Sequence, residues 1–157
     1  MKEFVGKTQS QGVKMGVVVS RFNEMITEGL LAGALNTLKE AGIADEAITL
    51  VRVPGSFELP LAAQRLAQTG TFEAIVCLGA VIRGETPHFD YICLQASNGL
   101  REVALKYDLP VAFGLITADT VEQALARAGE ERNKGSEAAT SAVEMANLMK
   151  DLEADGE

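Results

Sequence analysis

The sequence predicts a single α/β domain, residues 1–157, in which helices cover both faces of a four-stranded parallel sheet. Four continuous apolar runs are typical of strands buried on both faces, and segments with the period of an amphipathic helix follow them. Repeated strand–helix units with right-handed crossovers form such a sheet. A chain of 157 residues can bury its core without disulfides or metal, and we find no internal repeat or linker that would divide it.

The first strand–helix unit follows a polar segment, residues 1–12, that we expect to be loosely ordered. The apolar run at residues 13–19 predicts a strand. Asn23 can cap the next helix, and Gly42 is placed to end that helix after about Ala41.

The second unit has its strand at residues 48–53. Residues 54–58 then turn the chain into a helix with Pro60 in its first turn and Gly70 beyond its end. Proline and glycine favour these two helix boundaries, so the pattern fixes where this helix begins and ends.

The third unit contains the only histidine of the chain, His88. Residues 74–78 predict a fully buried strand, and from Phe89 onward apolar residues recur three and four apart, as they do on one face of a helix. Residues 79–90 should therefore form a strand-to-helix turn. Ligands bind at this side of open α/β sheets, so we expect the active site here.

The last part of the chain contains one more strand, at residues 110–116. Thr120 and Gln123 have the spacing of a capping box for a helix through Ala128. The polar segment 129–135 separates that helix from a last one, whose apolar stripe consists of Ala139, Ala142, Val143, Ala146 and Met149. From Glu153 onward the chain is acidic, and we expect it to be loosely ordered.

Charge and composition narrow the class of partner. The net charge is −8 and no block of lysine or arginine stands out, so we expect neither nucleic acid nor an anionic membrane as a partner. No apolar run approaches the length of a membrane span and the N-terminus lacks a secretory pattern, which makes the cytoplasm the expected location. Cys77 and Cys93 lie where buried thiols act as small hydrophobes, and no cysteine pair suggests zinc or redox chemistry.

Two groups in the 79–90 segment are candidates for chemistry. Histidine is the residue type that exchanges protons near neutral pH, although a lone histidine is often structural. The backbone N–H groups at residues 84–86, with the Thr86 hydroxyl, precede a helix start and could hold a phosphate. The alternative is an ordinary helix cap, in which Thr86 or Asp90 satisfies the free donors.

Aromatic residues make up only 5% of the chain, yet Phe22 and Phe57 both follow strands on the expected ligand side. Such rings could stack on a flat ligand while Glu58 accepts hydrogen bonds from hydroxyl groups. The alternative is that both rings cover the core and that Glu58 caps its own helix; residue spacing leaves both open. For Arg127, too, a structural role is open, in which it does no more than stabilise the carbonyl end of its helix.

Several neighbours of this fold class are excluded. The turn after the first strand lacks the hydroxyl-rich and glycine-rich phosphate loop of a flavodoxin, and the strand ends lack the acidic residues of a receiver domain. No Walker loop or dinucleotide fingerprint occurs. These absences narrow the class without naming a reaction.

Four segments together closely resemble the 6,7-dimethyl-8-ribityllumazine synthase (riboflavin synthase beta-chain) family. They are SRFN at 20–23, VPGSFELP at 53–60, GAVIRGETPHFD at 79–90 and RAG at 127–129. The resemblance spans about residues 13–150. It implies that 5-amino-6-(D-ribitylamino)uracil condenses with 3,4-dihydroxy-2-butanone 4-phosphate to form the lumazine, phosphate and water, without a metal or an organic cofactor.

The resemblance also assigns roles by position. It implies that Phe22 stacks on the pyrimidine, that Ser56, Phe57 and Glu58 hold the ribityl chain, and that Ala80, Val81 and Ile82 lie along the ring. It implies phosphate binding at Glu85 and Thr86 and proton transfer by His88. Phe113 and Arg127 would come from a neighbouring subunit, Phe113 to close over the ring and Arg127 to pair with the phosphate.

The family has flavodoxin-like subunits assembled as homopentamers, and in some relatives twelve pentamers form an icosahedral shell of 60 subunits that can enclose riboflavin synthase. The 129–135 segment departs from the expected glycine-containing loop, and its added acids could repel or pair with Arg132 at a shell contact. Two alternatives to the enzyme are a flavin-binding or shell protein without activity and an enzyme of this fold acting on another amine and carbonyl pair.

Overall fold

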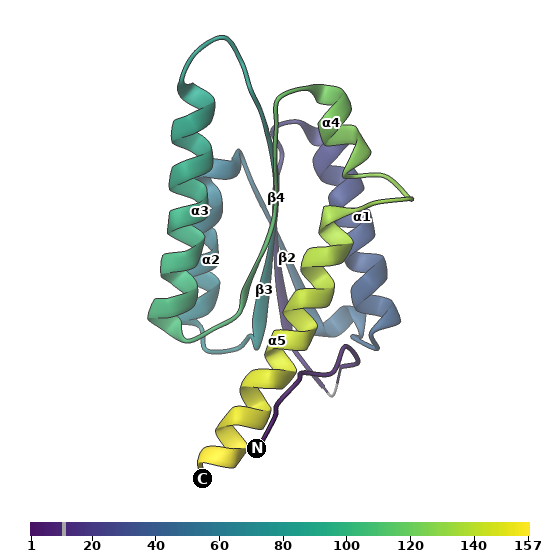
Figure 1. The fold of residues 1–157 in the computed structure, drawn as a ribbon, viewed down its shortest axis with the longest axis vertical. Helices are drawn as coiled ribbons and strands as arrows, with labels where there is room; N and C mark the ends of the chain where they lie inside the picture. Colours follow the sequence, from purple (N-terminus) through teal and green to yellow (C-terminus); the bar gives the residue numbers. More distant parts are fainter. Residues whose placement is uncertain (11) are drawn as a thin grey trace.

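The computed structural model describes residues 1–10 and 12–157, and it confirms the three-layer α/β/α architecture (Figure 1). The four strands are parallel and lie in the order β2-β1-β3-β4. They are β1 (Met15–Ser20), β2 (Ile48–Val53), β3 (Ala74–Ile82) and β4 (Val111–Ala118). The α-helices are α1 (Glu24–Glu40), α2 (Leu59–Gln68), α3 (His88–Tyr107), α4 (Val121–Ala126) and α5 (Lys134–Gly156), with short 3₁₀ turns η1 (Asp45–Ala47) and η2 (Ser56–Glu58).

The helices divide between the two faces of the sheet, as Figure 1 shows. Helices α1, α4 and α5 cover one face, and a core that includes Leu30, Leu38 and Val143 lies beneath them. Helices α2 and α3 cover the other face over Leu59 and Leu100. Every residue of the central strand β1 is buried, because helices lie on both sides of it.

Glycines end two helices as the sequence predicted. Gly42 and Gly70 have φ angles of +87° and +66°, which side chains disfavour, and each follows its helix by two residues. Pro60 lies in the first turn of α2, also as predicted. Helix α4 is shorter than we expected, since it ends at Ala126.

Strand β3 is longer than predicted. We expected it to end at residue 78, where pairing with β1 does end, but Gly79–Ile82 continue to pair with Leu115–Ala118 of β4. Strand β4 correspondingly extends to Ala118 rather than to residue 116. Pairing with β4, which the apolar pattern does not encode, therefore extends the strand beyond Gly79.

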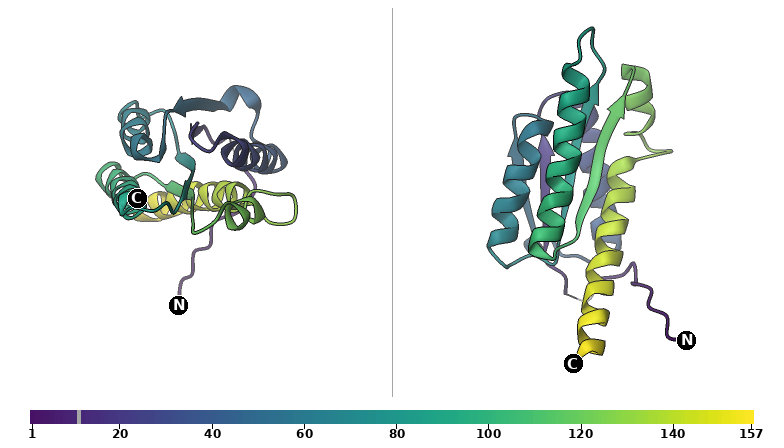
Figure 2. Two further views of the ribbon diagram at one scale, coloured as in Figure 1. Left: turned by 90° about the horizontal axis from the view of Figure 1, so that it is seen from above. Right: turned by 60° about the vertical axis from the view of Figure 1, so that its left-hand side comes forward.

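Helix α5 continues to Gly156, so the residues from Glu153 onward, which we expected to be loosely ordered, prolong the helix. The first ten residues contain no helix or strand. They nevertheless contact α5, because the Asn147 side-chain amide donates hydrogen bonds to the carbonyl oxygens of Lys7 and Gln9. Figure 2 shows α5 projecting beyond the sheet. None of the described helices is both long enough and apolar enough to cross a membrane.

The strand order places a crevice between β1 and β3. These two strands are neighbours, but α1 leads from β1 to β2 on one side, while α3 leads from β3 to β4 on the other. Loops at the carboxyl ends of the two strands therefore diverge, and a ligand can enter between them.

Candidate active site

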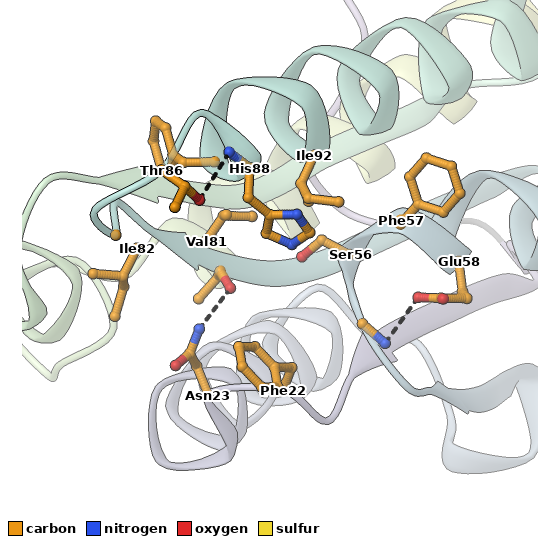
Figure 3. Close-up of a pocket in the computed structure, with 14 residues that line it drawn as sticks. Phe22, Asn23, Ser56, Phe57, Glu58, Val81, Ile82, Thr86, His88 and Ile92 are labelled. Carbon is orange, nitrogen blue, oxygen red and sulfur yellow. Dashed lines mark hydrogen bonds between the residues drawn. The ribbon is translucent and has the colours of Figure 1, made fainter.

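A cleft of about 450 Å³ lies at these carboxyl ends (Figure 3). The turn after β1, the 3₁₀ turn η2, the end of β3 and the start of α3 contribute its lining. The lining residues are Phe22, Asn23, Gly55, Ser56, Phe57, Glu58, Ala80, Val81, Ile82, Gly84, Thr86, His88, Phe89 and Ile92. Most of the predicted site residues therefore meet around one cavity, although they come from three separate parts of the chain.

The two aromatic rings at the cleft do not cover the core. Phe22 is 72% exposed and Phe57 is 57% exposed, and both rings line the cleft, Phe22 after the end of β1 and Phe57 after the end of the neighbouring strand β2. Large exposed apolar side chains lose their unfavourable hydration when a ligand covers them. Their exposure argues against the interpretation in which they only close the core, and in favour of contact with a ligand.

The η2 turn holds Ser56 and Glu58 at the cleft. The Glu58 carboxylate accepts a hydrogen bond of 3.1 Å from the Gly55 backbone N–H, so it does stabilise its own turn. Glu58 also lines the cleft, where its remaining lone pairs can accept from a ligand. Gly79 makes room for this turn, because a Cβ at that position would lie 2.7 Å from the Ser56 hydroxyl oxygen.

His88 begins α3, and its imidazole points into the cleft toward Ser56 (Figure 3). The residue is exposed, so water or substrate can reach it. Its backbone N–H approaches the Thr86 hydroxyl at 3.5 Å, which is the outer limit of a hydrogen bond. The arrangement can deliver or accept a proton inside the cleft.

The first turn of α3 offers backbone donors to the cleft. Among the described residues, no side chain caps this helix, although Thr86 or Asp90 could have done so. Asp90 instead pairs with Arg83, whose Nη1 lies 3.3 Å from Oδ1 of the carboxylate. A hydrogen bond to Asp119 is the main cause of a raised pKa for the Arg83 guanidinium, so this group stays charged. The open helix start favours an anion.

Asn23 is a lining residue that was predicted only as a helix cap. It does occupy the position before α1, but its side chain makes no cap. Its backbone has φ +62°, and its side-chain amide donates a 3.0 Å hydrogen bond to the carbonyl oxygen of Ala80. Asn23 thus joins the ends of β1 and β3 across the crevice. Asparagine tolerates a left-handed backbone better than most residues, and this preference was the signal that the sequence offered for such a turn.

The other lining residues outside the predicted set are Gly55, Gly84, Phe89 and Ile92. Gly55 and Gly84 adjoin predicted site residues and have no side chain to suggest a role. Phe89 and Ile92 belong to the apolar face that the sequence predicted for this helix. Their position near the start of α3 brings them to the cleft.

Three predicted residues do not line the cleft. Glu85 lies in the loop between Gly84 and Thr86, with its side chain outside the lining. Phe113 lies on β4 beside a separate hollow with Ser97, Leu100 and Arg101. Arg127 donates a 2.8 Å hydrogen bond to the Gln123 carbonyl oxygen of α4, which is the helix-end role left open by the sequence.

The cysteines take no part in the cleft lining. Cys77 is fully buried in β3, and burial raises the pKa of its thiol to about 12. Cys93 is half-buried on α3, where partial burial raises its thiol pKa as well. Both thiols are free, and the buried Cys77 behaves as the small hydrophobe that we predicted.

A comparison with protein families identifies the family to which the chain belongs. The model of the family described as 6,7-dimethyl-8-ribityllumazine synthase matches residues 12–150. The match covers most of the chain, which therefore belongs to this family of transferases of riboflavin biosynthesis.

Proposed function

We propose that, as a member of this family, the protein condenses 5-amino-6-(D-ribitylamino)uracil with 3,4-dihydroxy-2-butanone 4-phosphate at the cleft between β1 and β3. The products are 6,7-dimethyl-8-ribityllumazine, phosphate and water. The observation that carries the proposal is the convergence of exposed aromatic rings, a turn with a serine hydroxyl and a carboxylate, a helix start and an imidazole on one cavity. Each of these features suits one part of the two substrates.

The aminouracil would occupy the aromatic side of the cleft. Phe22 would stack on the pyrimidine, and Ala80, Val81 and Ile82 would lie along the ring at the end of β3. The turn formed by Ser56, Phe57 and Glu58 would hold the ribityl chain, because its serine hydroxyl, backbone and carboxylate can bond to successive hydroxyl groups.

The phosphate of the second substrate would bind at the start of α3. Backbone N–H groups at Glu85 and Thr86, the Thr86 hydroxyl and the helix dipole all favour a dianion there. The first turn supports this assignment, since Pro87 makes no side-chain cap and the only side-chain contact that its backbone donors make among the described residues, from the His88 N–H to the Thr86 hydroxyl, is at the 3.5 Å limit of a hydrogen bond.

We assign Phe113 and Arg127 to a neighbouring subunit of a homopentamer. Both side chains lie outside the cleft of their own chain and near its surface, with Phe113 47% exposed. In the assembly, Phe113 would close over the ring and Arg127 would fork onto the phosphate. Whether pentamers assemble further into a shell, and whether such a shell encloses riboflavin synthase, depends on contacts outside a single chain.

His88 would move the protons of the reaction. The amine of the uracil attacks the ketone, a Schiff base forms with loss of water, phosphate leaves, and the second amine closes the ring with loss of water. Each step transfers protons between nitrogen, carbon and oxygen, which an imidazole beside the reacting atoms can assist. Holding both substrates together supplies a further large part of the acceleration.

A steady-state assay tests the proposal. The purified protein would be given both substrates, and lumazine fluorescence would be followed against a protein-free control for the spontaneous reaction. We expect a rate that saturates with each substrate and exceeds the control. A rate equal to the control, from protein that still binds the aminouracil or riboflavin, would instead favour a binding or shell protein without activity.

A further inference from the structure

Arg83, the residue after β3, contacts two other elements, the end of β4 and the start of α3. Its backbone N–H donates to the Ala118 carbonyl oxygen at 2.9 Å, and its Nε donates to Asp119 at 2.8 Å, both at the end of β4. Its Nη1 approaches Asp90 of α3 at 3.3 Å, and its guanidinium lies 4.4 Å from the centre of the Phe89 ring. One side chain thus joins both ends of the loop at residues 84–88 and fixes them to β4.

The loop itself has little other support. Residues 84–88 are all exposed, and a Cβ added at Gly84 would meet no atom within 4 Å. Among the described residues, one side-chain hydrogen bond forms inside the loop, in which the His88 N–H approaches the Thr86 hydroxyl at 3.5 Å. The shape of the loop therefore depends on how its two ends are held.

We propose that Arg83 is a positioning residue that holds the 84–88 loop in the shape required for phosphate binding and for the orientation of His88. The inference rests on the proposed function, and it adds a residue that touches neither substrate. Without Arg83 the loop ends would be joined only through the backbone. The phosphate would then have to order the loop on binding, at a cost in affinity.

An arginine is required because its contacts point in different directions. The planar guanidinium presents Nε to one carboxylate and Nη1 to another while it lies over an aromatic ring. A lysine ammonium could pair with Asp119 or Asp90 but could not keep both carboxylate contacts and the ring contact together. Arg83→Lys should therefore restore only part of what Arg83→Ala loses.

Kinetics separates this role from general stabilisation. We expect Arg83→Ala to raise KM for the butanone phosphate about tenfold, since small misplacements of a positioned group cost this much or more. KM for the aminouracil should change less than twofold. Asp119→Asn should also raise KM for the butanone phosphate more than KM for the aminouracil, but by a smaller factor than Arg83→Ala does. Both ion pairs are exposed, so Tm should change little.

The matched control is Lys150→Ala, which removes another ion pair, a partly exposed one. In this pair the Lys150 Nζ lies 3.8 Å from Oε1 of Glu73, just before the start of β3 and away from the loop. It should leave both KM values unchanged. Equal changes in the two KM values of Arg83→Ala, or none, would overturn the inference. If Arg83→Ala fails to assemble, Arg83→Lys and Asp119→Asn carry the same test.

Hydrogen exchange provides a measurement that does not depend on activity. In the intact protein, backbone amides in a peptide covering residues 83–92 should exchange faster in Arg83→Ala than in wild type, while other peptides keep their rates. Unchanged exchange there would overturn the inference. If wild type shows no rate above the spontaneous reaction, the proposed function fails, and this comparison still decides whether Arg83 holds the loop.

Discussion

His88 is the imidazole of the cleft, and its removal tests how much of the rate depends on proton transfer. General acid–base catalysis contributes about 10²–10⁴-fold, but these two substrates also react without help. We therefore expect His88→Ala to slow turnover roughly 100-fold, near the lower limit, while activity stays measurable above background. The measurement is kcat at saturating substrates.

Size-exclusion chromatography of His88→Ala against wild type controls for assembly. A correctly assembled variant with no activity at all would show that His88 does more than transfer protons.

Cys77 makes stability depend on pH in a predictable direction. Its folded-state thiol has a pKa of about 12, against 9.0 for a free thiol, because burial penalises the thiolate. The folded state therefore keeps this proton while the unfolded state loses it, and the stabilisation is lost as pH rises from about 9 toward 12. We expect the free energy of unfolding of wild type to fall over this range relative to that of Cys77→Ala.

Urea denaturation of both proteins at several pH values measures this difference. The comparison cancels the titration of tyrosines, lysines and Cys93, which both proteins share. A difference that stays constant between pH 8 and 11 would contradict the prediction.

Residue type and position predicted that Phe22, Phe57 and His88 lie near one another, because each follows a predicted strand at its ligand end, and all three line the cleft. The same reasoning missed the role of Asn23, because asparagine before a helix usually caps it. Here the left-handed backbone turns the side chain toward Ala80 instead. Sequence patterns report how often a residue plays a role, whereas the local backbone angle decides which role it plays.

At the scale of the elements, Asn133 connects the two longest helices on its face of the sheet. Its side-chain oxygen caps α5 by accepting from the Ser136 N–H at 3.1 Å, and its amide donates to the Gly29 carbonyl oxygen of α1 at 2.9 Å. We expect Asn133→Ala to lower the free energy of unfolding by about 2 kcal/mol, the sum of a lost cap and a lost buried hydrogen bond. Chemical denaturation at one fixed protein concentration measures it.

Two variants distinguish the contributions. Asn133→Asp keeps the capping oxygen and loses the donor to Gly29, so it should cost about half as much. Asn36→Ala removes an exposed asparagine of α1 that bonds to Glu40, and it should cost little. If Asn133→Ala were no more costly than Asn36→Ala, the contact between α1 and α5 would not depend on this side chain.

The number and order of the elements could be predicted because strands and helices differ in apolar period, while several boundaries could not. Gly79 suggested the end of β3, yet the strand continues because β4 pairs with residues beyond it. Pairing is a property of two segments about 36 residues apart, and no local pattern contains it. Helix α5 extends beyond its apolar stripe for a different reason, because an acidic sequence can remain helical without a packing partner.

At the scale of the whole molecule, the cleft is incomplete with respect to the predicted site, because Phe113 and Arg127 lie elsewhere on the same chain. If each site joins His88 of one subunit to Arg127 of another, mixing two impaired variants should restore activity. We expect co-assembly of His88→Ala and Arg127→Ala subunits at equal amounts to rebuild about a quarter of the sites, by random assortment around a cyclic oligomer.

The measurement is kcat per subunit of the mixture against that of each variant alone, with light scattering to establish whether the particles are pentamers, pairs of pentamers or shells. Subunits that are assembled separately and then mixed are the control. Activity equal to the average of the two variants would place each site within one chain and overturn the intersubunit assignment.

The two ends of the chain lie at the end of the sheet opposite the cleft, where α5 projects past the strands (Figure 1, Figure 2). A helix of 23 residues spans about 35 Å, so its last turns stand clear of the loops that line the cleft. A reporter or carrier domain fused to the carboxyl end would therefore be displayed away from the cleft. The fold separates the surface available for attachment from the surface that holds the proposed active site.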